Sequence, residues 1–292
     1  MSSEKYDDLG DRMKRYEMVT TSQKLIPGLP LYARIDGRHF SKFTKGFGYP
    51  YPELGDKCGY EMTSAMQLTA KALCEEFNCT LVETHSDEIS LGWTELEKAP
   101  FDGEYFKLVS NLASYATSVF LYKIRPLIPE KLERGQYPSF DCRVFQVPSL
   151  IELANLFVWR QNDCMRGCLN QYAQQFFSHR ELDGKSGADR LKMCLDAGHD
   201  YENKVNDVFK YGYFCRRETY QAEIPEEFRT PIQIANDVTT VTRSRINRLM
   251  IDFPISKLLN KIQFLFYDEE PALGETRLEH GHRPEHKGAE EE

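Results

Sequence analysis

The sequence contains no long apolar segment. None of its apolar runs approaches the roughly 20 residues that a membrane-spanning helix requires. The polar start of the chain, residues 1–10, lacks the hydrophobic region of a signal peptide. No internal repeat is present either. We therefore expect a globular protein that is neither anchored in a membrane nor built as a repeat array.

Disulfide and zinc motifs are also missing. The eight cysteines are scattered along the chain, none of them forms a Cys-x-x-Cys pair, and no Cys/His cluster has the spacing of a zinc site. Reduced thiols in the cytosol are the simplest account of this pattern. We therefore predict a cytoplasmic protein, and we expect Cys164 and Cys168, which share a helix face, to be buried thiols.

An excess of positive charge, which would favour a nucleic-acid partner, is absent as well. The formal net charge is −8, but nine acidic and three basic residues lie from Asp268 onward, so that the rest of the chain is near −2. A nearly neutral body can still carry a basic face. Candidates for such a face are Lys210, Arg216, Arg217, Arg243, Arg245 and Arg248. Ordinary solvated surface charges explain these residues equally well.

The sequence does have the composition of a folded protein, with 41% hydrophobic residues and with 18 Phe and 16 Tyr in a chain of 292 residues. Its patterning predicts strands and helices in the order β-α-β-β-α-β. The strands are expected at 31–36, 79–85, 88–93 and 140–147, and the helices at 54–77 and about 101–124. This order is that of ferredoxin-like domains, so we predict an α+β sandwich in which helices pack on a sheet.

The chain divides into three predicted parts. Residues 1–148 form the first domain, which begins with a charged helical arm over 6–23. Residues 149–267 form a helical and mixed region that begins with a long helix over 149–177, for which Ser149 is the expected N-cap. Residues 268–292 are polar and are expected to be an acidic, flexible tail.

Two acidic sites fall at the ends of predicted strands. Asp36 ends the first strand, and Asp87 and Glu88 lie in the turn between the next two strands. Parallel neighbours joined by a right-handed crossover align their carboxyl ends, so we expect these carboxylates to converge. Converging carboxylates can hold two Mg²⁺ ions for nucleotidyl transfer.

The residues around Asp36 add to this interpretation. Gly37 permits a close backbone approach to a metal or phosphate, and its carbonyl can itself be a ligand of Mg²⁺. Arg34 and Arg38 flank the site, where their guanidinium groups can meet phosphate oxygens. Each acidic site taken alone is better explained as a turn; their position at matching ends of one βαββ unit is what favours a metal site.

Four short motifs together resemble a known family. They are Arg34-Ile35-Asp36-Gly37-Arg38-x-Phe40, Ser86-Asp87-Glu88-x-Ser90, Phe140-Asp141-x-Arg143-Val144 and Trp159-Arg160-Gln161-x-Asp163. In this order they are similar to the tRNA-His guanylyltransferase family, the reverse (3′–5′) RNA polymerases. The resemblance covers roughly residues 5–220. It implies a polymerase-like palm, two-metal catalysis and the addition of nucleotides to the 5′ end of a tRNA.

The resemblance also implies roles for individual residues. Catalysis would depend on Asp36, Asp87 and Glu88, with two Mg²⁺ ions held by Asp36, the Gly37 carbonyl and Asp87. ATP, GTP and other nucleoside triphosphates would be bound by Arg34, Gly37, Arg38, Lys45, Ser86, Lys107 and Arg143. From charge and nearby aromatic residues we add Lys210, Arg216 and Arg217 as candidates for RNA binding. Family members are homotetramers, dimers of dimers, and the arm over 6–23 and the helix over 149–177 are candidates for that interface.

One segment departs from the family pattern. Members that guanylylate tRNA-His carry His-Ile-Asn-Asn-Leu-Tyr-Asn after the Trp-Arg-Gln motif, whereas this chain reads Met165-Arg166-Gly167-Cys168-Leu169-Asn170-Gln171. The sequence that follows is similar to the guanylyltransferase-like branch, which is associated with template-dependent repair of truncated tRNA 5′ ends after activation by ATP. We therefore favour repair. The alternatives are guanylylation of tRNA-His at position −1, a nucleotidyl cyclase on the same palm, and a non-catalytic RNA-binding module.

Some polar residues near these motifs have simpler explanations. Arg160 and Asp163 are spaced for an i,i+3 ion pair that supports the palm. His39 and His85, although close in sequence to the acidic sites, are expected to pack or to face solvent rather than to catalyse.

Overall fold

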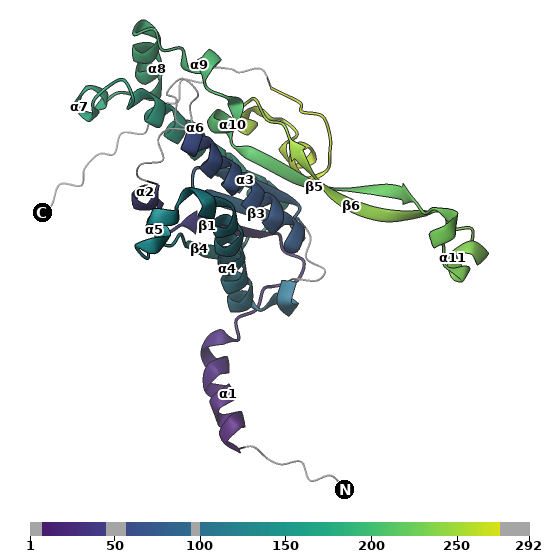
Figure 1. Cartoon of the computed structure of the whole chain (residues 1–292). Helices are drawn as coiled ribbons and strands as arrows, with labels where there is room; N and C mark the ends of the chain where they lie inside the picture. Colours follow the sequence, from purple (N-terminus) through teal and green to yellow (C-terminus); the bar gives the residue numbers. More distant parts are fainter. Residues whose placement is uncertain (1–7, 45–56, 95–99, 275–292) are drawn as a thin grey trace, which may run out of the picture.

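A single antiparallel sheet forms the centre of the molecule (Figure 1). The computed structural model describes residues 8–44, 57–94 and 100–274. In it the six strands follow the order β4-β1-β3-β2-β5-β6. The strands are β1 (Leu31–Gly37), β2 (Leu81–His85), β3 (Glu88–Trp93), β4 (Phe140–Gln146), β5 (Tyr213–Glu223) and β6 (Thr240–Leu249).

The first four strands confirm the predicted ferredoxin-like arrangement. Helix α3 (Lys57–Glu76) connects β1 to β2, and α4 (Tyr105–Ile124) connects β3 to β4. Contrary to the prediction, β1 and β2 are not neighbours. Strand β3 lies between them and is antiparallel to both. The end of β1 still lies beside the β2–β3 turn, since Asp36 pairs with Glu88 at the start of β3.

The alternation of side chains along β1 divides the core between the two faces of the sheet. Leu31, Ala33 and Ile35 pack in one cluster with residues of α3 and α4. Tyr32 points to the other face and packs with residues of α6 (Leu150–Ala173), including Phe157. Ser149 caps α6 as predicted, because its hydroxyl accepts a hydrogen bond from the Glu152 N–H.

Strands β5 and β6 form a long hairpin that the sequence analysis did not predict. The first residues of β5 pair with β2, but the outer part of the hairpin is held only by pairing between its own two strands. It projects from the body and carries α11 (Pro231–Ala235) near its tip (Figure 1). Most of its outer residues are exposed, so the apolar alternation that identifies a strand in the sequence is missing.

Short helices follow α6 and pack against its end. They are α7 (His179–Leu182), α8 (Gly187–Asp196), α9 (Tyr201–Lys204) and α10 (Asp207–Tyr211). With the last turns of α6 they enclose a small apolar cluster of their own, which includes Tyr172, Leu182 and Cys194. Cys164 and Cys168 are buried free thiols, as predicted.

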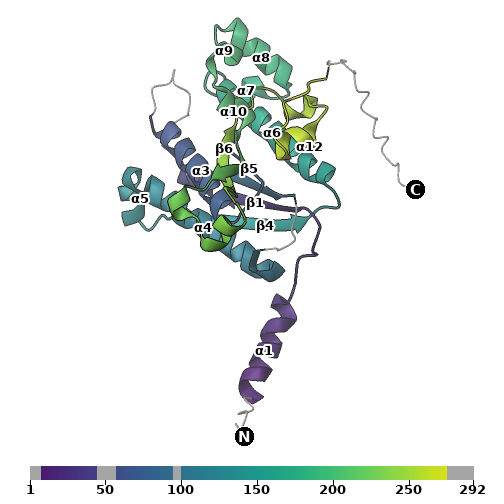
Figure 2. The same ribbon diagram turned by 90° about the vertical axis from the view of Figure 1, so that its right-hand side faces the viewer.

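The remaining helices are α1 (Asp8–Thr21), α2 (Phe40–Phe43), α5 (Pro129–Glu133) and α12 (Lys261–Phe266). Helix α1 confirms a helical arm over its range; it has no buried residue and extends away from the sheet in both views (Figures 1 and 2). Within the described ranges, no helix is both long enough and apolar enough to cross a membrane.

Candidate active site

The acidic sites meet at one end of the sheet, on the face covered in part by α6. Because Tyr32 faces α6, the alternation along β1 places Arg34 and Asp36 on that same face. On the edge strand β4, Arg143 lies opposite Arg34 and Asp141 lies opposite Asp36. These four charged residues therefore occupy one face of two neighbouring strands.

The backbone joins the end of β1 tightly to the β2–β3 turn. The Gly37 N–H donates a hydrogen bond to the Asp87 carbonyl over 2.9 Å. A Cβ atom on Gly37 would lie 2.5 Å from the Phe40 ring and 2.9 Å from the Asp87 Cβ. Only glycine fits this approach. The structure therefore brings Asp36, Gly37 and Asp87 together, as the sequence analysis expected.

The electrostatics of this cluster suit a cation. Burial raises the pKa of the Asp87 carboxyl, and the charge of Asp36 raises it further. Two like charges that repel each other in a partly buried site are stabilised by a bound metal ion. The available donors are carboxylate and carbonyl oxygens, which are the ligands that Mg²⁺ prefers. The residues present thus fit a magnesium centre.

Glu88 has a different environment from the two aspartates. Its side chain is buried and accepts a hydrogen bond of 2.5 Å from the Arg160 Nε–H, while its second oxygen lies 3.8 Å from Arg34 Nε. Burial raises the pKa of Glu88, although the neighbouring His85 and Arg160 lower it. Both carboxylate oxygens thus face arginines, so Glu88 fastens the turn that carries Asp87.

Arg160 connects the site to α6. Its guanidinium also pairs with Asp163 at 2.5 Å, which confirms the predicted i,i+3 pair. It lies over the ring of Trp159, 4.5 Å from the ring centroid, and Arg34 lies 5.5 Å from the same ring. The contact with Glu88 was not predicted, since 72 residues separate the two in sequence; the only sequence signal was that both belong to the family's motifs.

Beside Glu88, a buried pair lies on β2. The His85 Nδ1 is 2.6 Å from the Glu83 Oε1. Burial alone lowers the pKa of His85, but the charge of Glu83 and the hydrogen bond to it outweigh that effect and raise the pKa. Glu83, His85 and Glu88 are close enough to hold a metal ion. However, Glu83 already pairs with His85, and Glu88 with Arg160, so these side chains form a network among themselves.

The predicted nucleotide contacts have different outcomes. Arg34, Ser86 and Arg143 lie around the acidic residues, and Arg38 is exposed directly after Gly37. Lys45 lies outside the described residues.

Lys107 is misplaced in the prediction. Thr117, ten residues further along α4, accepts a hydrogen bond from the Phe140 N–H. Phe140 pairs with Gly37, so Thr117 marks the active-site end of the helix. Ten helical residues span about 15 Å, and α4 packs on the opposite face of the sheet. Lys107 pairs instead with Glu104 at 3.1 Å, so its own chain does not bring it to Asp36.

The three predicted RNA-binding cations also require correction. Lys210 and Arg216 are buried. Lys210 donates to the Glu202 carbonyl and pairs with Asp207, and Arg216 donates to the Phe264 carbonyl and pairs with Asp268 and Glu218. Arg217 donates to the carbonyls of Cys74 and Cys79. All three cations are therefore engaged by acceptors within the protein, and the buried Lys210 and Arg216 are not available to RNA phosphates.

Exposed cations are found instead along the projecting hairpin. Arg243, Arg245 and Arg248 of β6 are all exposed. Arg245 lies over Tyr220, 5.2 Å from its ring centroid, and Arg248 lies over Tyr213 at 5.4 Å. Of the six residues proposed for a basic face, the three on β6 are therefore accessible to solvent.

Known proteins share both the sequence and this architecture. The family model described as tRNAHis guanylyltransferase matches residues 10–148, the part that carries the acidic cluster. A bacterial tRNA(HIS) guanylyltransferase-like protein, solved in complex with ATP, superposes with a TM-score of 0.67 at 28% identity, covering 88% of this chain and 99% of that protein. These similarities support the tRNA-His guanylyltransferase family for this chain.

Curated relatives of the tRNA-His guanylyltransferase family agree with this assignment. The tRNA(His) guanylyltransferase of Debaryomyces hansenii is 28% identical over 222 residues, which cover 70% of this chain and 80% of that protein. A probable tRNA(His) guanylyltransferase of Dictyostelium discoideum is 28% identical over 251 residues, covering 82% and 91%. The similarity to these proteins and structures confirms the predicted palm-like fold and the prediction that the chain is a nucleotidyltransferase.

Proposed function

We propose that this protein adds nucleotides in the 3′–5′ direction to the 5′ end of a tRNA, with Asp36, the Gly37 carbonyl and Asp87 as ligands of two Mg²⁺ ions. The observation that carries the proposal is the meeting of these three residues at the Gly37–Asp87 hydrogen bond of 2.9 Å. When bound, the ions would lower the pKa of the attacking hydroxyl and screen the charge of the transferring and leaving groups.

The chemistry of the 5′ end determines what the site must do. A 5′-monophosphate is a poor electrophile, because its leaving group would be water or hydroxide. In activation, the 5′-phosphate attacks the α-phosphorus of ATP, which releases pyrophosphate and gives a 5′-adenylylated RNA. Attack by the 3′-hydroxyl of the incoming nucleotide on the 5′ phosphorus then releases AMP. A 5′-triphosphate end would release pyrophosphate without prior activation. Neither route requires a protein nucleophile.

The arginines around the acidic cluster would bind and orient the phosphates. Arg34 is aligned by Trp159 at 5.5 Å and by Glu88 at 3.8 Å, so its guanidinium is held beside the aspartates. Arg143 lies opposite Arg34 and its side chain is 60% exposed. Such forks bind phosphate oxygens in fixed directions and so help to keep the attack in line. Arg38 and Ser86 complete the proposed phosphate contacts.

Within the family, we favour repair of truncated 5′ ends. The support is that residues 165–171 lack the histidine and the adjacent asparagine pair of the guanylylating members, and that a bacterial guanylyltransferase-like protein covers 88% of the chain. The alternative, addition of G at position −1 of tRNA-His, is supported by the names of the curated relatives. A cyclase or a non-catalytic module has no comparable support.

The RNA would be held outside the acidic cluster. We propose that Arg243, Arg245 and Arg248 on the exposed hairpin contact its phosphates. A homotetramer, with α1 as part of the interface, and a cytoplasmic location remain predictions; the fully unburied α1 and the free cysteines agree with them. In such an assembly Lys107 could reach a triphosphate only from a second copy.

One assay tests the proposal. The full chain is incubated with Mg²⁺, ATP, all four nucleoside triphosphates and tRNAs that lack their first nucleotide, with either a monophosphate or a triphosphate end. We expect 5′ extension, and we expect Asp87→Asn to abolish it while the circular dichroism spectrum stays unchanged. Absence of extension at both ends would refute the proposal. Extension of intact tRNA-His alone would favour the guanylylation alternative.

A further inference from the structure

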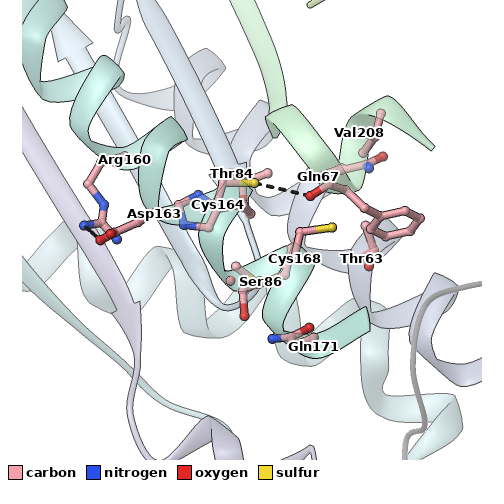
Figure 3. A pocket seen from close by; sticks show the side chains of 14 residues that line it. Thr63, Gln67, Thr84, Ser86, Arg160, Asp163, Cys164, Cys168, Gln171 and Val208 are labelled. Carbon is pink, nitrogen blue, oxygen red and sulfur yellow. Dashed lines mark hydrogen bonds and ion pairs between the residues drawn. The ribbon is translucent and has the colours of Figure 1, made fainter. Parts of the chain in front are cut away.

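Two cavities lie at opposite ends of the β2–β3 hairpin. The first lies beside the catalytic turn, between α3 and α6, where Arg160 and Asp163 form an ion pair (Figure 3). The second has a volume of about 730 Å³ and lies beside α4, where α3 and β3 end. Trp93 in its wall is five residues along β3 from Glu88, which corresponds to about 17 Å. The second cavity is therefore separate from the proposed metal centre.

Aromatic rings form much of the wall of this second cavity, which we call the aromatic cavity. They belong to Phe77, Trp93, Phe101 and Tyr115. The centroid of the Phe77 ring lies 6.3 Å from that of Phe101 and 5.7 Å from that of Tyr115, and the ring planes are inclined by 60° and 84°. Rings set at such angles around a space resemble the aromatic cages that recognise ammonium groups.

Phe101 is held in an unusual backbone conformation. The φ angles of Phe101, Asp102 and Gly103 are 55°, 54° and 75° in succession, and a bulky residue rarely adopts a positive φ. The turn is fixed by the chain that follows α1, because the Leu25 N–H donates to the Gly103 carbonyl over 2.8 Å. Phe101 nevertheless stays 39% exposed. Strain at a residue that is not part of the core indicates a role in binding.

The charge of the wall is negative. Glu76, the last residue of α3, lines the aromatic cavity, and no lysine or arginine does so among the described residues. Its carboxylate forms no ion pair with a described residue. Burial raises the pKa of the Tyr115 hydroxyl, and the charges of Glu76 and Glu75 raise it further, so both carboxylates act on this part of the wall. A phosphate would be repelled here, whereas a cation would be attracted.

Four hydrogen-bond donors around the cavity are directed at backbone carbonyls. The Trp93 Nε1–H donates to the Phe77 carbonyl over 2.9 Å, and the Asn111 amide donates to a carbonyl of its own helix over 2.7 Å. The hydroxyls of Ser114 and Ser118 also donate to carbonyls of α4. Hydroxyl and amide oxygens keep lone pairs that can accept. The wall therefore suits a ligand that donates hydrogen bonds.

We propose that the aromatic cavity binds an alkylammonium group, with its positive charge against the rings of Phe101 and Tyr115 and near the Glu76 carboxylate. Rings, negative charge and acceptors are the features that an ammonium group requires together. Such a group is carried by a free polyamine or by a lysine side chain of another protein. The inference does not depend on the proposed function, because the aromatic cavity uses no residue of the catalytic site.

Calorimetric titrations of the full chain, without RNA and at constant ionic strength, test this assignment. The probes are spermidine and Nα-acetyl-lysine methylamide, and the variants are Glu76→Gln, Phe101→Leu and Tyr115→Leu. Loss of the carboxylate should weaken binding by about 2- to 5-fold. Each leucine keeps an apolar side chain but removes a ring face, and should also weaken binding by about 2- to 5-fold. Circular dichroism verifies that each variant is folded.

A matched control excludes general attraction to an acidic protein. Glu61→Gln makes the same change at an exposed position of α3 that does not line the cavity, and it should bind both probes as the wild type does. The probe whose affinity falls in Glu76→Gln and Phe101→Leu identifies the source: spermidine for a free polyamine, the lysine derivative for a lysine side chain.

Two results would overturn the assignment. The first is that both probes bind Glu76→Gln and Phe101→Leu as tightly as the wild type, because the attraction would then come from the acidic surface at large. The second is that Nα-acetyl-norleucine methylamide, which lacks the ammonium group, binds as tightly as the lysine derivative. That result would assign the aromatic cavity to a neutral apolar ligand.

Discussion

Removal of the Arg160 guanidinium is the most informative perturbation of the site. Arg160 and Glu88 have side chains that are 9% and 8% exposed, and they are joined by a hydrogen bond of 2.5 Å. In Arg160→Met, which keeps most of the aliphatic volume, Glu88 would keep Arg34, at 3.8 Å, and the neighbouring His85 as partners. The carboxylate would then be buried with little compensation.

The expected magnitude follows from the burial. Breaking a buried ion pair by removing one partner typically costs about 3–5 kcal/mol. The contacts of Glu88 with Arg34 and His85 remain, so we expect Arg160→Met to lower the free energy of unfolding by about 3 kcal/mol, at the low end of this range. The double variant Arg160→Met/Glu88→Gln leaves no buried charge at this position and should recover most of the loss. Urea denaturation followed by circular dichroism measures all members of this double-mutant cycle.

The same cycle separates stability from function. Because Glu88 holds the turn that carries Asp87, Arg160→Met should also reduce 5′ extension under conditions in which the variant is fully folded. The reasoning would be refuted if Arg160→Met and Glu88→Gln each changed the free energy of unfolding by less than about 1 kcal/mol and showed no coupling. A stability loss that the double variant does not recover would show that Arg160 acts through packing and not through its charge.

Three further perturbations test other parts of the site. Gly37→Ala would place a Cβ atom 2.5 Å from the Phe40 ring and 2.9 Å from the Asp87 Cβ, so we expect loss of 5′ extension and weaker Mg²⁺ binding by calorimetry; an active variant would show that this close approach is not needed. Although burial tends to raise it, the pKa of Asp163 is lowered by hydrogen bonds from Arg166 and Arg160 and by the charge of Arg160. A lowered pKa stabilises the folded state above the pKa of an unfolded aspartate, about 3.9, so the stability difference between the wild type and Asp163→Asn should be full at neutral pH and disappear as the pH falls below that range; a difference that does not vary with pH would contradict this account. Arg216→Met should lower thermal stability without changing the salt dependence of tRNA binding, whereas Arg245→Gln should leave stability unchanged and reduce the slope of log affinity against log salt by about 1; the reverse result would restore Arg216 as an RNA contact.

The sequence predicted the order of the palm elements because each has a clear periodic pattern. Strand β1 and helices α3 and α4 contribute alternating or helically spaced apolar residues to one core, and Ser149 marks the start of α6. Asp36, Gly37 and Asp87 could be identified for the same reason: they stand at the ends of well-defined strands. By contrast, the outer half of the β5–β6 hairpin has mostly exposed residues, and without a buried face it leaves no periodic signal.

Local pattern is therefore sufficient to indicate the family resemblance, the succession of strands and helices and the position of the acidic residues within them. Which of the charged residues serve the site depends on the tertiary structure. In the fold, β3 rather than β2 lies beside β1, and Arg160 pairs with Glu88. Lys107 lies on the helix that packs on the opposite face of the sheet, and Lys210 and Arg216 are buried. The sequence shows an arginine or a lysine in the same way whether its partner is a phosphate or a buried carboxylate. Only the packing of distant segments determines its partner.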